Sequence, residues 1–224
     1  MEKLQQSGRR VVPITGRPAG WCDHIARMWP VDGLVGENGA FYFYYDRLQR
    51  KMVRRYARSE ADRRRDRQKL DALAATILAQ VPGAAVAADQ SFRVADLAID
   101  FCEDVPALPF DQVLTIAALF EAAGATAKIS SIHVNGWFGD YDKLTMSKCL
   151  FSEVFGEDLD LIRNEVVFVG DSPNDVPMFA FFPNAVGVAN IRHFEGMLEA
   201  RPAWVAGREG GQGFAEVAAA LLET

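Results

Sequence analysis

Long apolar runs, cysteines and histidines are scarce in this 224-residue chain. No apolar run approaches the ~18 residues that a membrane helix needs, and the N-terminal MEKLQQSGRR lacks the apolar stretch of a signal peptide. The three cysteines, Cys22, Cys102 and Cys149, are irregularly spaced, and no CxxC pair or paired histidine accompanies them. This spacing argues against a disulfide framework and gives no support to a zinc site. We therefore predict a cytoplasmic protein without a membrane partner.

The chain also lacks a net positive charge, since 24 Lys and Arg stand against 30 Asp and Glu. Nucleic-acid-binding proteins are normally basic, so we predict no nucleic-acid partner. The one basic stretch, residues 47–69, holds eleven Lys and Arg and three Asp and Glu. We interpret it as one or two helices with a solvated basic face. A basic face beside an anionic substrate is an alternative, and RNA binding is another, although interleaved aromatic residues are missing.

Half of the residues are apolar, which is enough for a sizeable core. Short strand-like and helix-like segments alternate along the chain, and this pattern predicts an α/β fold with a parallel sheet covered by helices on both faces. The expected strands are 11–14, 33–35, 41–45, 84–87, 95–101, 127–134, 166–169, 185–188 and 204–205. The expected helices after the basic stretch are 110–123, 143–155, 175–182, 194–200 and 213–222, with one more at 19–29.

The strongest chemical signal is VVFVGDSPNDVPMF at 166–179, where a buried strand ends in a turn that carries Asp171 and Asp175. Open α/β sheets place their sites at the carboxyl ends of strands. Mg²⁺ prefers hard oxygen ligands, so Asp171 is a candidate direct ligand, and Asn174 and Asp175 complete or orient the shell. The alternative is purely structural, with Asp171 as a turn residue and Asp175 as a helix N-cap.

A second strand, in VVPITGR, ends in a turn that suits a phosphate group. The hydroxyl of Thr15 and the N–H of Gly16 can bind a phosphate oxygen, and the following helix adds a favourable dipole. Thr15 as a turn residue and Arg17 as a surface charge are the alternatives. Pro13 is unusual here because proline removes a ladder donor from a central strand. Either a missing neighbouring strand or a bulge can relieve this cost, and both remain open.

The third element is DYDKLTMSKCL, in which Lys143 opens a helix. A lysine at a helix start opposes the helix dipole, so helix stabilisation explains it poorly. It is better explained as a cation held against a phosphate and the metal-bound carboxylates. Lys148 lies further inside the helix and is more typical of a surface residue.

These three elements together resemble the haloacid dehalogenase superfamily, in the branch with Cof-like sugar-phosphate phosphatases, sucrose-phosphate phosphatase and phosphomannomutase. VVPITGR is similar to its second motif, DYDK to its third and GDSPND to its fourth. GENGA at 36–40, GVAN at 187–190 and the Gly-rich REGGQGFAEV match further elements of that branch. The resemblance implies a Rossmann-like core at 1–43 and 136–224 and an inserted α/β cap domain at 44–135.

The resemblance also implies a magnesium-dependent enzyme that acts on small phosphorylated substrates, as a phosphatase or a phosphomutase. It implies four catalytic residues, Thr15, Lys143, Asp171 and Asp175. The implied metal site comprises Asp171, Asn174 and Asp175. The implied substrate-binding residues are Thr15, Gly16, Arg17, Asn38, Lys143 and Asn174. The oligomeric state is not implied.

One family element is missing from the sequence. Family members begin with a strand that ends in DxDGT, whose first aspartate is the nucleophile and whose second is the general acid and base. This strand is central in the family's sheet, between those that carry the second and fourth motifs. We therefore expect an upstream extension of roughly 30–40 residues, the size of a βα unit, and little turnover by the chain alone. A non-catalytic phosphate-binding or structural relative that lost its first motif is the alternative.

Overall fold

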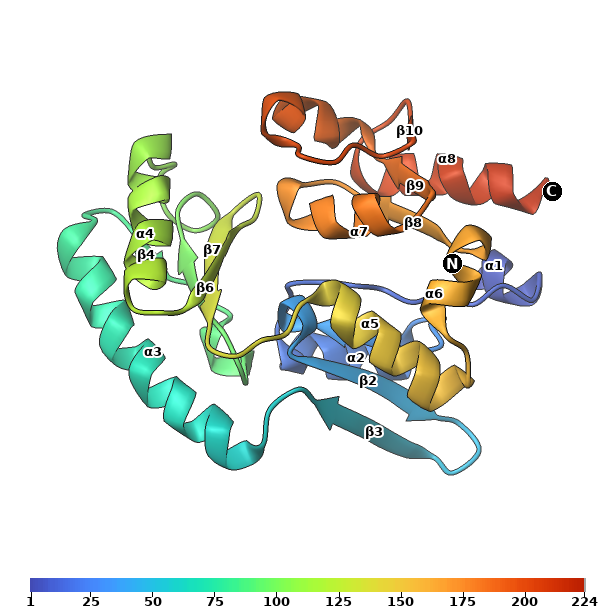
Figure 1. Ribbon diagram of the computed structural model, residues 1–224, viewed down its shortest axis with the longest axis horizontal. Coiled ribbons are helices and arrows are strands. Elements are labelled where there is room, and N and C mark those ends of the chain that lie inside the picture. Colours follow the sequence, from blue (N-terminus) through green and yellow to red (C-terminus); the bar gives the residue numbers. More distant parts are fainter. Residues whose placement is uncertain (224) are drawn as a thin grey trace.

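The computed structural model describes residues 1–223, without the side chains of Glu195 and Met197, and divides them into two lobes (Figure 1). Both chain ends build the core lobe, residues 1–56 and 143–223, and residues 60–137 build the inserted lobe. The fold is mixed α/β, as the sequence predicts. None of the helices in this described part combines the length and apolar character of a membrane span.

The first half of the core lobe is an antiparallel sheet in the order β1-β2-β3. Its strands are β1 (Leu34–Gly36), β2 (Phe41–Asp46) and β3 (Lys51–Tyr56). The helix α2 (Ala19–Met28) packs on it through one apolar stripe, which includes Cys22 and Ile25. The extended segment 11–15 lies beside β1 through a parallel bridge between Ile14 and Val35.

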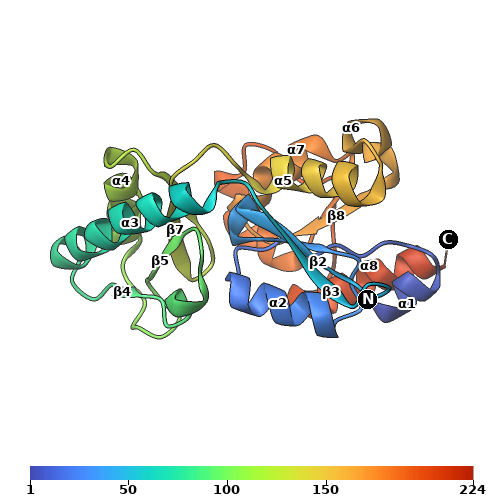
Figure 2. The ribbon, with the colours of Figure 1, turned by 90° about the horizontal axis from the view of Figure 1, so that it is seen from below.

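The second half of the core lobe is a parallel sheet in the order β10-β9-β8 (Figure 1). Figure 2 shows the core lobe and the inserted lobe from a second side. Its strands are β8 (Val167–Gly170), β9 (Asn184–Gly187) and β10 (Trp204–Val205). The helices of the core lobe besides α2 are α1 (Glu2–Gln6), α5 (Lys143–Leu150), α6 (Leu159–Ile162), α7 (Val176–Phe181) and α8 (Gly210–Leu222). Within the described residues, no strand hydrogen-bonds to both halves, so the sheet of the core lobe is divided in two.

The inserted lobe is a four-stranded antiparallel sheet in the order β4-β5-β7-β6. The strands are β4 (Ala85–Val86), β5 (Leu97–Asp100), β6 (Thr126–Ile129) and β7 (His133–Trp137), and two helices, α3 (Glu60–Gln80) and α4 (Phe110–Ala122), lie beside them. Leu70 and Ile77 of α3 and Ile116 and Phe120 of α4 are fully buried in a common core. The lobe therefore has a hydrophobic core of its own.

The basic stretch differs from the sequence prediction, because residues 51–56 form a strand rather than a helix. This strand pairs with β2 along its whole length after a turn in which Arg50 has a φ of 53°. It is an edge strand, where outward lysines and arginines are tolerated and discourage pairing with other chains. The hairpin thus belongs to the same sheet as β1. The expected strand 127–134 is likewise two strands, β6 and β7, joined by a tight turn.

The segment 11–14 is extended, but only Ile14 makes a strand-like bridge. The carbonyl of Pro13 accepts from Val35 N at 2.9 Å, and Thr15 N donates to Val35 O at 2.9 Å. Because the N–H and C=O of one strand residue point the same way, the donor that Pro13 lacks would face β1. The proline therefore weakens pairing on the β1 side and removes no donor from the opposite side.

Candidate active site

A cavity of about 1040 Å³ separates the two halves of the core lobe. Segment 11–17 forms one wall and residues 166–171 form the opposite wall. Apolar side chains from helices on both sheet faces line it, among them Leu4, Phe214 and Leu221 from one side and Phe151, Leu159 and Ile162 from the other. The cavity is thus an apolar slot between two strand edges, covered above and below by helices.

Both walls of the slot carry unpaired backbone groups. On one wall, Pro13 and Thr15 bond toward β1, so the alternating residues Val12 and Ile14 direct their N–H and C=O groups into the slot. Among the described residues, none bonds to these groups. On the other wall, Gly170 O accepts from Val188 N, so Val167 and Val169 face the slot in the same way. Buried backbone groups are nearly always paired, so this slot can accept the backbone of an extended segment.

The two strand edges run parallel, because their carboxyl ends meet at one residue, Asn38. Asn38 N donates to Thr15 O at 3.2 Å, and Asn174 Nδ2 donates to Asn38 Oδ1 at 2.9 Å. Thr15 ends the first edge and Asn174 lies just after the second. Asn38 Nδ2 is buried and has no hydrogen-bond partner in the part of the chain that the structure describes, so it remains available to a ligand.

A buried ion pair lies at the same end of the slot. Lys143 Nζ donates to Asp175 Oδ1 at 2.7 Å, and the two side chains are only 11% and 7% exposed. The helix α5 begins directly after Asp142, whose carboxylate caps it by accepting from Thr145 N at 2.7 Å. The cap fixes the first turn and with it the direction of Lys143. The structure thus brings Lys143 and the GDSPND turn together, as the sequence predicts for a cation against a carboxylate.

Asp171 lies beside this pair. Asp171 N donates to Asp175 Oδ2 at 3.0 Å, so both oxygens of Asp175 are engaged. A Cβ on Gly170 would lie 2.8 Å from Asp175 Oδ2, which explains why glycine precedes Asp171. Burial, and then the charge of Asp175, raise the pKa of Asp171. A carboxylate beside a second carboxylate favours a bound cation.

The donor set fits magnesium in part. Asp171 supplies a carboxylate and Asn174 an amide oxygen, because only its Nδ2 is engaged with Asn38. Asp175 is committed to Lys143, so an orienting role suits it better than direct ligation. No group of three or more His, Cys, Asp or Glu side chains is placed to hold a metal ion in residues 1–223. Mg²⁺ often binds through one or two carboxylates plus water and phosphate, so this small set is compatible with it.

Thr15 and Gly16 form the turn at the other edge of the slot. Thr15 Oγ1 accepts from Arg17 N at 3.0 Å, which closes the turn and leaves the Thr15 hydroxyl proton free to donate. Arg17 Nη1 lies 3.9 Å from Asp89 and 3.7 Å from Glu103 of the inserted lobe. These are long contacts for a half-exposed arginine. Thr15, Gly16 and Arg17 line the same cavity as Lys143 and Asp171. The three predicted loop tips therefore lie around one cavity.

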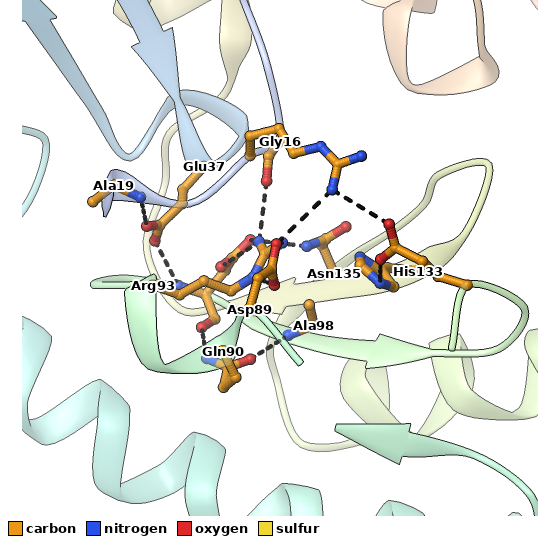
Figure 3. Close-up of polar contacts among 12 residues, drawn as sticks. Gly16, Ala19, Glu37, Asp89, Gln90, Arg93, Ala98, His133 and Asn135 are labelled. Carbon is orange, nitrogen blue, oxygen red and sulfur yellow. Dashed lines mark hydrogen bonds and ion pairs between the residues drawn. The ribbon is translucent and has the colours of Figure 1, made fainter. Parts of the chain in front are cut away.

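Several residues of this site escaped the sequence analysis. Arg93, His133 and Asn135 of the inserted lobe line the cavity opposite the Thr15 turn (Figure 3). His133 Nε2 lies 2.9 Å from Glu103 Oε2, although the alignment is too poor for a hydrogen bond. Burial, followed by the charge of Arg93, lowers the pKa of His133, so the imidazole is neutral at pH 7. The sequence favours an ordinary structural or surface role for His133, because its partners lie far away along the chain.

Glu37 also escaped notice, although it is fully buried. It lies in a turn where Glu37, Asn38 and Gly39 all have positive φ, of 40°, 56° and 107°. A Cβ on Gly39 would lie 2.1 Å from Asp142 O, so this turn packs directly on the start of α5. The sequence does carry a sign of this buried charge, because Glu37 is the one charged residue in the otherwise largely apolar stretch LVGENGAFYF. The turn brings the Thr15 loop, Lys143 and Asn174 to one point.

Glu37 leads to a pH prediction. Burial, and then the charge of Asp96, raise the pKa of Glu37 to about 7 against the opposing effect of its N–H donors. A carboxyl pKa raised by folding makes the protonated form the one that stabilises the fold. We therefore expect the free energy of unfolding to fall by on the order of 2 kcal/mol between pH 4.5 and 7 from this group. Urea unfolding of wild type and Glu37→Gln across this range measures it, and a slope unchanged by the substitution contradicts it.

Solved structures with the same arrangement are known. A protein from Thermoplasma acidophilum is 17% identical, with 99% of this chain and 86% of that chain matched at a TM-score of 0.67. The sucrose-phosphatase from Synechocystis, solved with sucrose and phosphate, is 14% identical, with 98% and 88% matched at a TM-score of 0.65. A haloacid dehalogenase-like hydrolase from Bacteroides thetaiotaomicron is 15% identical, with 98% and 89% matched at 0.62.

The chain has the haloacid dehalogenase fold. At these identities the likeness establishes the haloacid dehalogenase architecture, with its Rossmann-like core and inserted α/β lobe, and not the activity. No family model and no curated protein matches the sequence. The fold does place Thr15, Lys143 and Asp171 at the strand and helix ends where an open α/β sheet builds its site.

Proposed function

We propose that this site serves a magnesium-dependent phosphohydrolase that acts on small phosphate esters. The single observation that supports this most strongly is the buried Lys143–Asp175 pair beside Asp171, in a cavity that also contains the Thr15 turn. Cations, a metal-binding carboxylate and a phosphate-suited turn are the groups that stabilise a transferring phosphoryl group. The sucrose-phosphatase likeness makes a sugar phosphate the first substrate class to test.

Each residue has a distinct role in this proposal. Thr15 and the N–H of Gly16 hold oxygens of the phosphoryl group, and Asn38 Nδ2 supplies a further donor. Lys143 neutralises the charge that develops on that group, while Asp175 holds the ammonium in place. Asp171 and Asn174 would hold Mg²⁺, which supplies Lewis-acid stabilisation when bound. Arg17, at the rim, attracts the anionic substrate.

Neither carboxylate beside Lys143 is free to attack the phosphorus atom in this proposal. Asp171 holds the metal, and Asp175 is paired with Lys143. We propose that an extended segment fills the slot, parallel to both edges, and places a carboxylate just beyond its last paired residue. Its backbone would pair with Val12 and Ile14 on one side and with Val167 and Val169 on the other. Since helices cover both faces, the segment has to be apolar on both faces.

A synthetic peptide tests this proposal. The peptide consists of two lysines for solubility, about five valines and isoleucines, and a closing Asp-Leu-Asp. At a concentration of about 100 Kd, binding to the folded chain adds about 2.7 kcal/mol, which raises Tm by about 5–10 °C in a chain of this size. We also expect hydrolysis of p-nitrophenyl phosphate that requires both the peptide and Mg²⁺. Differential scanning calorimetry and a colorimetric assay measure the two effects.

Two matched peptides separate pairing from chemistry. A central proline removes a ladder donor, so that peptide should neither stabilise the chain nor restore hydrolysis. A peptide that ends in Asn-Leu-Asn should stabilise equally and leave hydrolysis at background. Equal stabilisation by the proline peptide would refute the strand-pairing proposal.

A second candidate function is phosphate binding without turnover. The observation that favours it is that the described site holds phosphate-suited donors and no free nucleophile. The two candidates differ in one measurement. A chain that binds inorganic phosphate and the Asp-containing peptide, and still hydrolyses no phosphate ester in Mg²⁺, is a binding protein.

A further inference from the structure

Arg93 of the inserted lobe reaches across to the Thr15 turn. Its Nη1 donates to Gly16 O at 3.0 Å and to both oxygens of Asp96 at 3.1 Å. Its Nε and Nη2 donate to the two oxygens of Asp89 at 2.9 and 3.1 Å. The Arg93 side chain is 1% exposed and that of Asp96 is fully buried. Asn135 Nδ2 donates to the same Asp96 at 3.0 Å and completes the network (Figure 3).

Glu37 holds the other end of the same turn. Its carboxylate accepts from Ala19 N, the first residue of α2, at 2.9 Å. The same carboxylate accepts from three consecutive N–H groups of the inserted lobe, those of Val94, Ala95 and Asp96, at 2.7 to 3.2 Å. Glu37 therefore ties the start of α2 to the segment that directly follows Arg93.

These two contacts hold both ends of the turn at residues 15–19, called the phosphate turn below. The carbonyl of Gly16 is held by Arg93, and the N–H of Ala19 is held through Glu37. Arg17 lies between the two fixed points, and its side chain makes two long ion pairs and a cation–π contact with Trp21. A peptide group whose carbonyl is fixed has a fixed orientation, because the peptide unit is planar. The Gly16 carbonyl belongs to the same peptide unit as the N–H of Arg17, which donates to Thr15 Oγ1 at 3.0 Å. The orientation of this N–H, and with it that of the Thr15 hydroxyl, thus depends on the position of Arg93.

We infer that Arg93 is a positioning residue, through which the inserted lobe sets the geometry of the phosphate-binding turn at residues 15–19. This inference rests on the proposed function for its phosphate readout. It gives the inserted lobe a second role besides covering the site, since segment 93–96 acts as a fixed clamp. Any movement of this lobe has to pivot about the clamp, because opening it would leave several buried charges unpaired.

The test compares Arg93→Lys with Arg58→Lys. Lysine keeps the charge and loses the planar fork that lets Arg93 contact Gly16, Asp89 and Asp96 at once. Arg58 pairs with Asp66 at 2.8 Å and does not contact the phosphate turn, so it is the matched control. We expect Arg93→Lys to weaken binding of inorganic phosphate in Mg²⁺ about tenfold by isothermal titration calorimetry, and to leave the affinity for Mg²⁺ unchanged. We expect Arg58→Lys to lower Tm only.

Hydrogen exchange of the backbone amides of Thr15, Gly16, Arg17 and Ala19 provides a readout that does not need phosphate. Faster exchange there in Arg93→Lys, and not in Arg58→Lys, supports the clamp. If wild type binds no phosphate and this exchange still rises, the clamp stands and the proposed function fails. Unchanged exchange together with unchanged phosphate affinity overturns the clamp. If Arg93→Lys does not fold, the isosteric Asp96→Asn replaces it, with the same directions and smaller effects expected.

Discussion

Replacing Asp171 by asparagine is expected to weaken Mg²⁺ binding at least about 100-fold, since even partners that only support a metal ligand contribute 10–100-fold. The same change should stabilise the metal-free chain. Asp171 lies beside Asp175, and desolvation and then the charge of Asp175 raise the pKa of Asp171, so its charge destabilises the fold until a cation is bound. Asparagine retains the shape and removes that charge.

Isothermal titration calorimetry measures the affinity, and calorimetric Tm values with and without Mg²⁺ measure the stability. Asp160→Asn is the matched control, because Asp160 undergoes the same chemical change in an exposed ion pair with Lys148. Wild type and Asp160→Asn should both gain Tm on addition of Mg²⁺, whereas Asp171→Asn should not. A normal Mg²⁺ response in Asp171→Asn would remove Asp171 from the metal site. In the peptide-supplemented assay, this variant should show no hydrolysis above background.

Replacing Lys143 by methionine is expected to destabilise the chain by about 3–5 kcal/mol, the usual cost of leaving one partner of a buried ion pair uncompensated. Asp175 would retain the Asp171 N–H as a donor and lose the ammonium at 2.7 Å. Methionine has a similar length, so the loss reports on the charge and not on a cavity. Urea unfolding monitored by circular dichroism measures the change.

The helix α5 offers a close control for this prediction. Lys148 also pairs with an aspartate, Asp160, at 2.8 Å, but these side chains are 37% and 56% exposed. Exposed pairs contribute about 0–1 kcal/mol, so Lys148→Met should have little effect. The double variant Lys143→Met/Asp175→Asn should recover part of the lost stability, because it removes both charges. Equal effects of the two single methionine variants would show that the burial of the Lys143 pair is unimportant.

Local sequence patterns were informative where the chemistry depends on one strand or helix end. The apolar run before Gly170 predicted β8, and the carboxylates after it fall at the carboxyl end of that strand, as expected. The unfavourable position of Lys143 at a helix start was a sign of an ionic partner, and that partner is Asp175. Local patterns gave the wrong element type for a strand at the edge of a sheet. Lys51–Tyr56 is rich in lysine and arginine and suggested a helix, although these side chains suit a strand whose outer edge faces water.

The sequence alone determined the order of the elements, the three loop tips and the kinds of groups they carry, because each depends on residues within one strand–turn–helix unit. Only the tertiary structure decided that Asn38 joins the Thr15 and Asn174 turns, that Asp175 is paired with Lys143, and that Glu37 of the core lobe and Arg93 of the inserted lobe hold the turn at residues 15–19. Arg93 and Gly16 are 77 residues apart in sequence, and Glu37 and Ala95 are 58 apart. Contacts over such separations leave no local periodicity, since they arise only when the two lobes pack and bury polar groups that must then find partners.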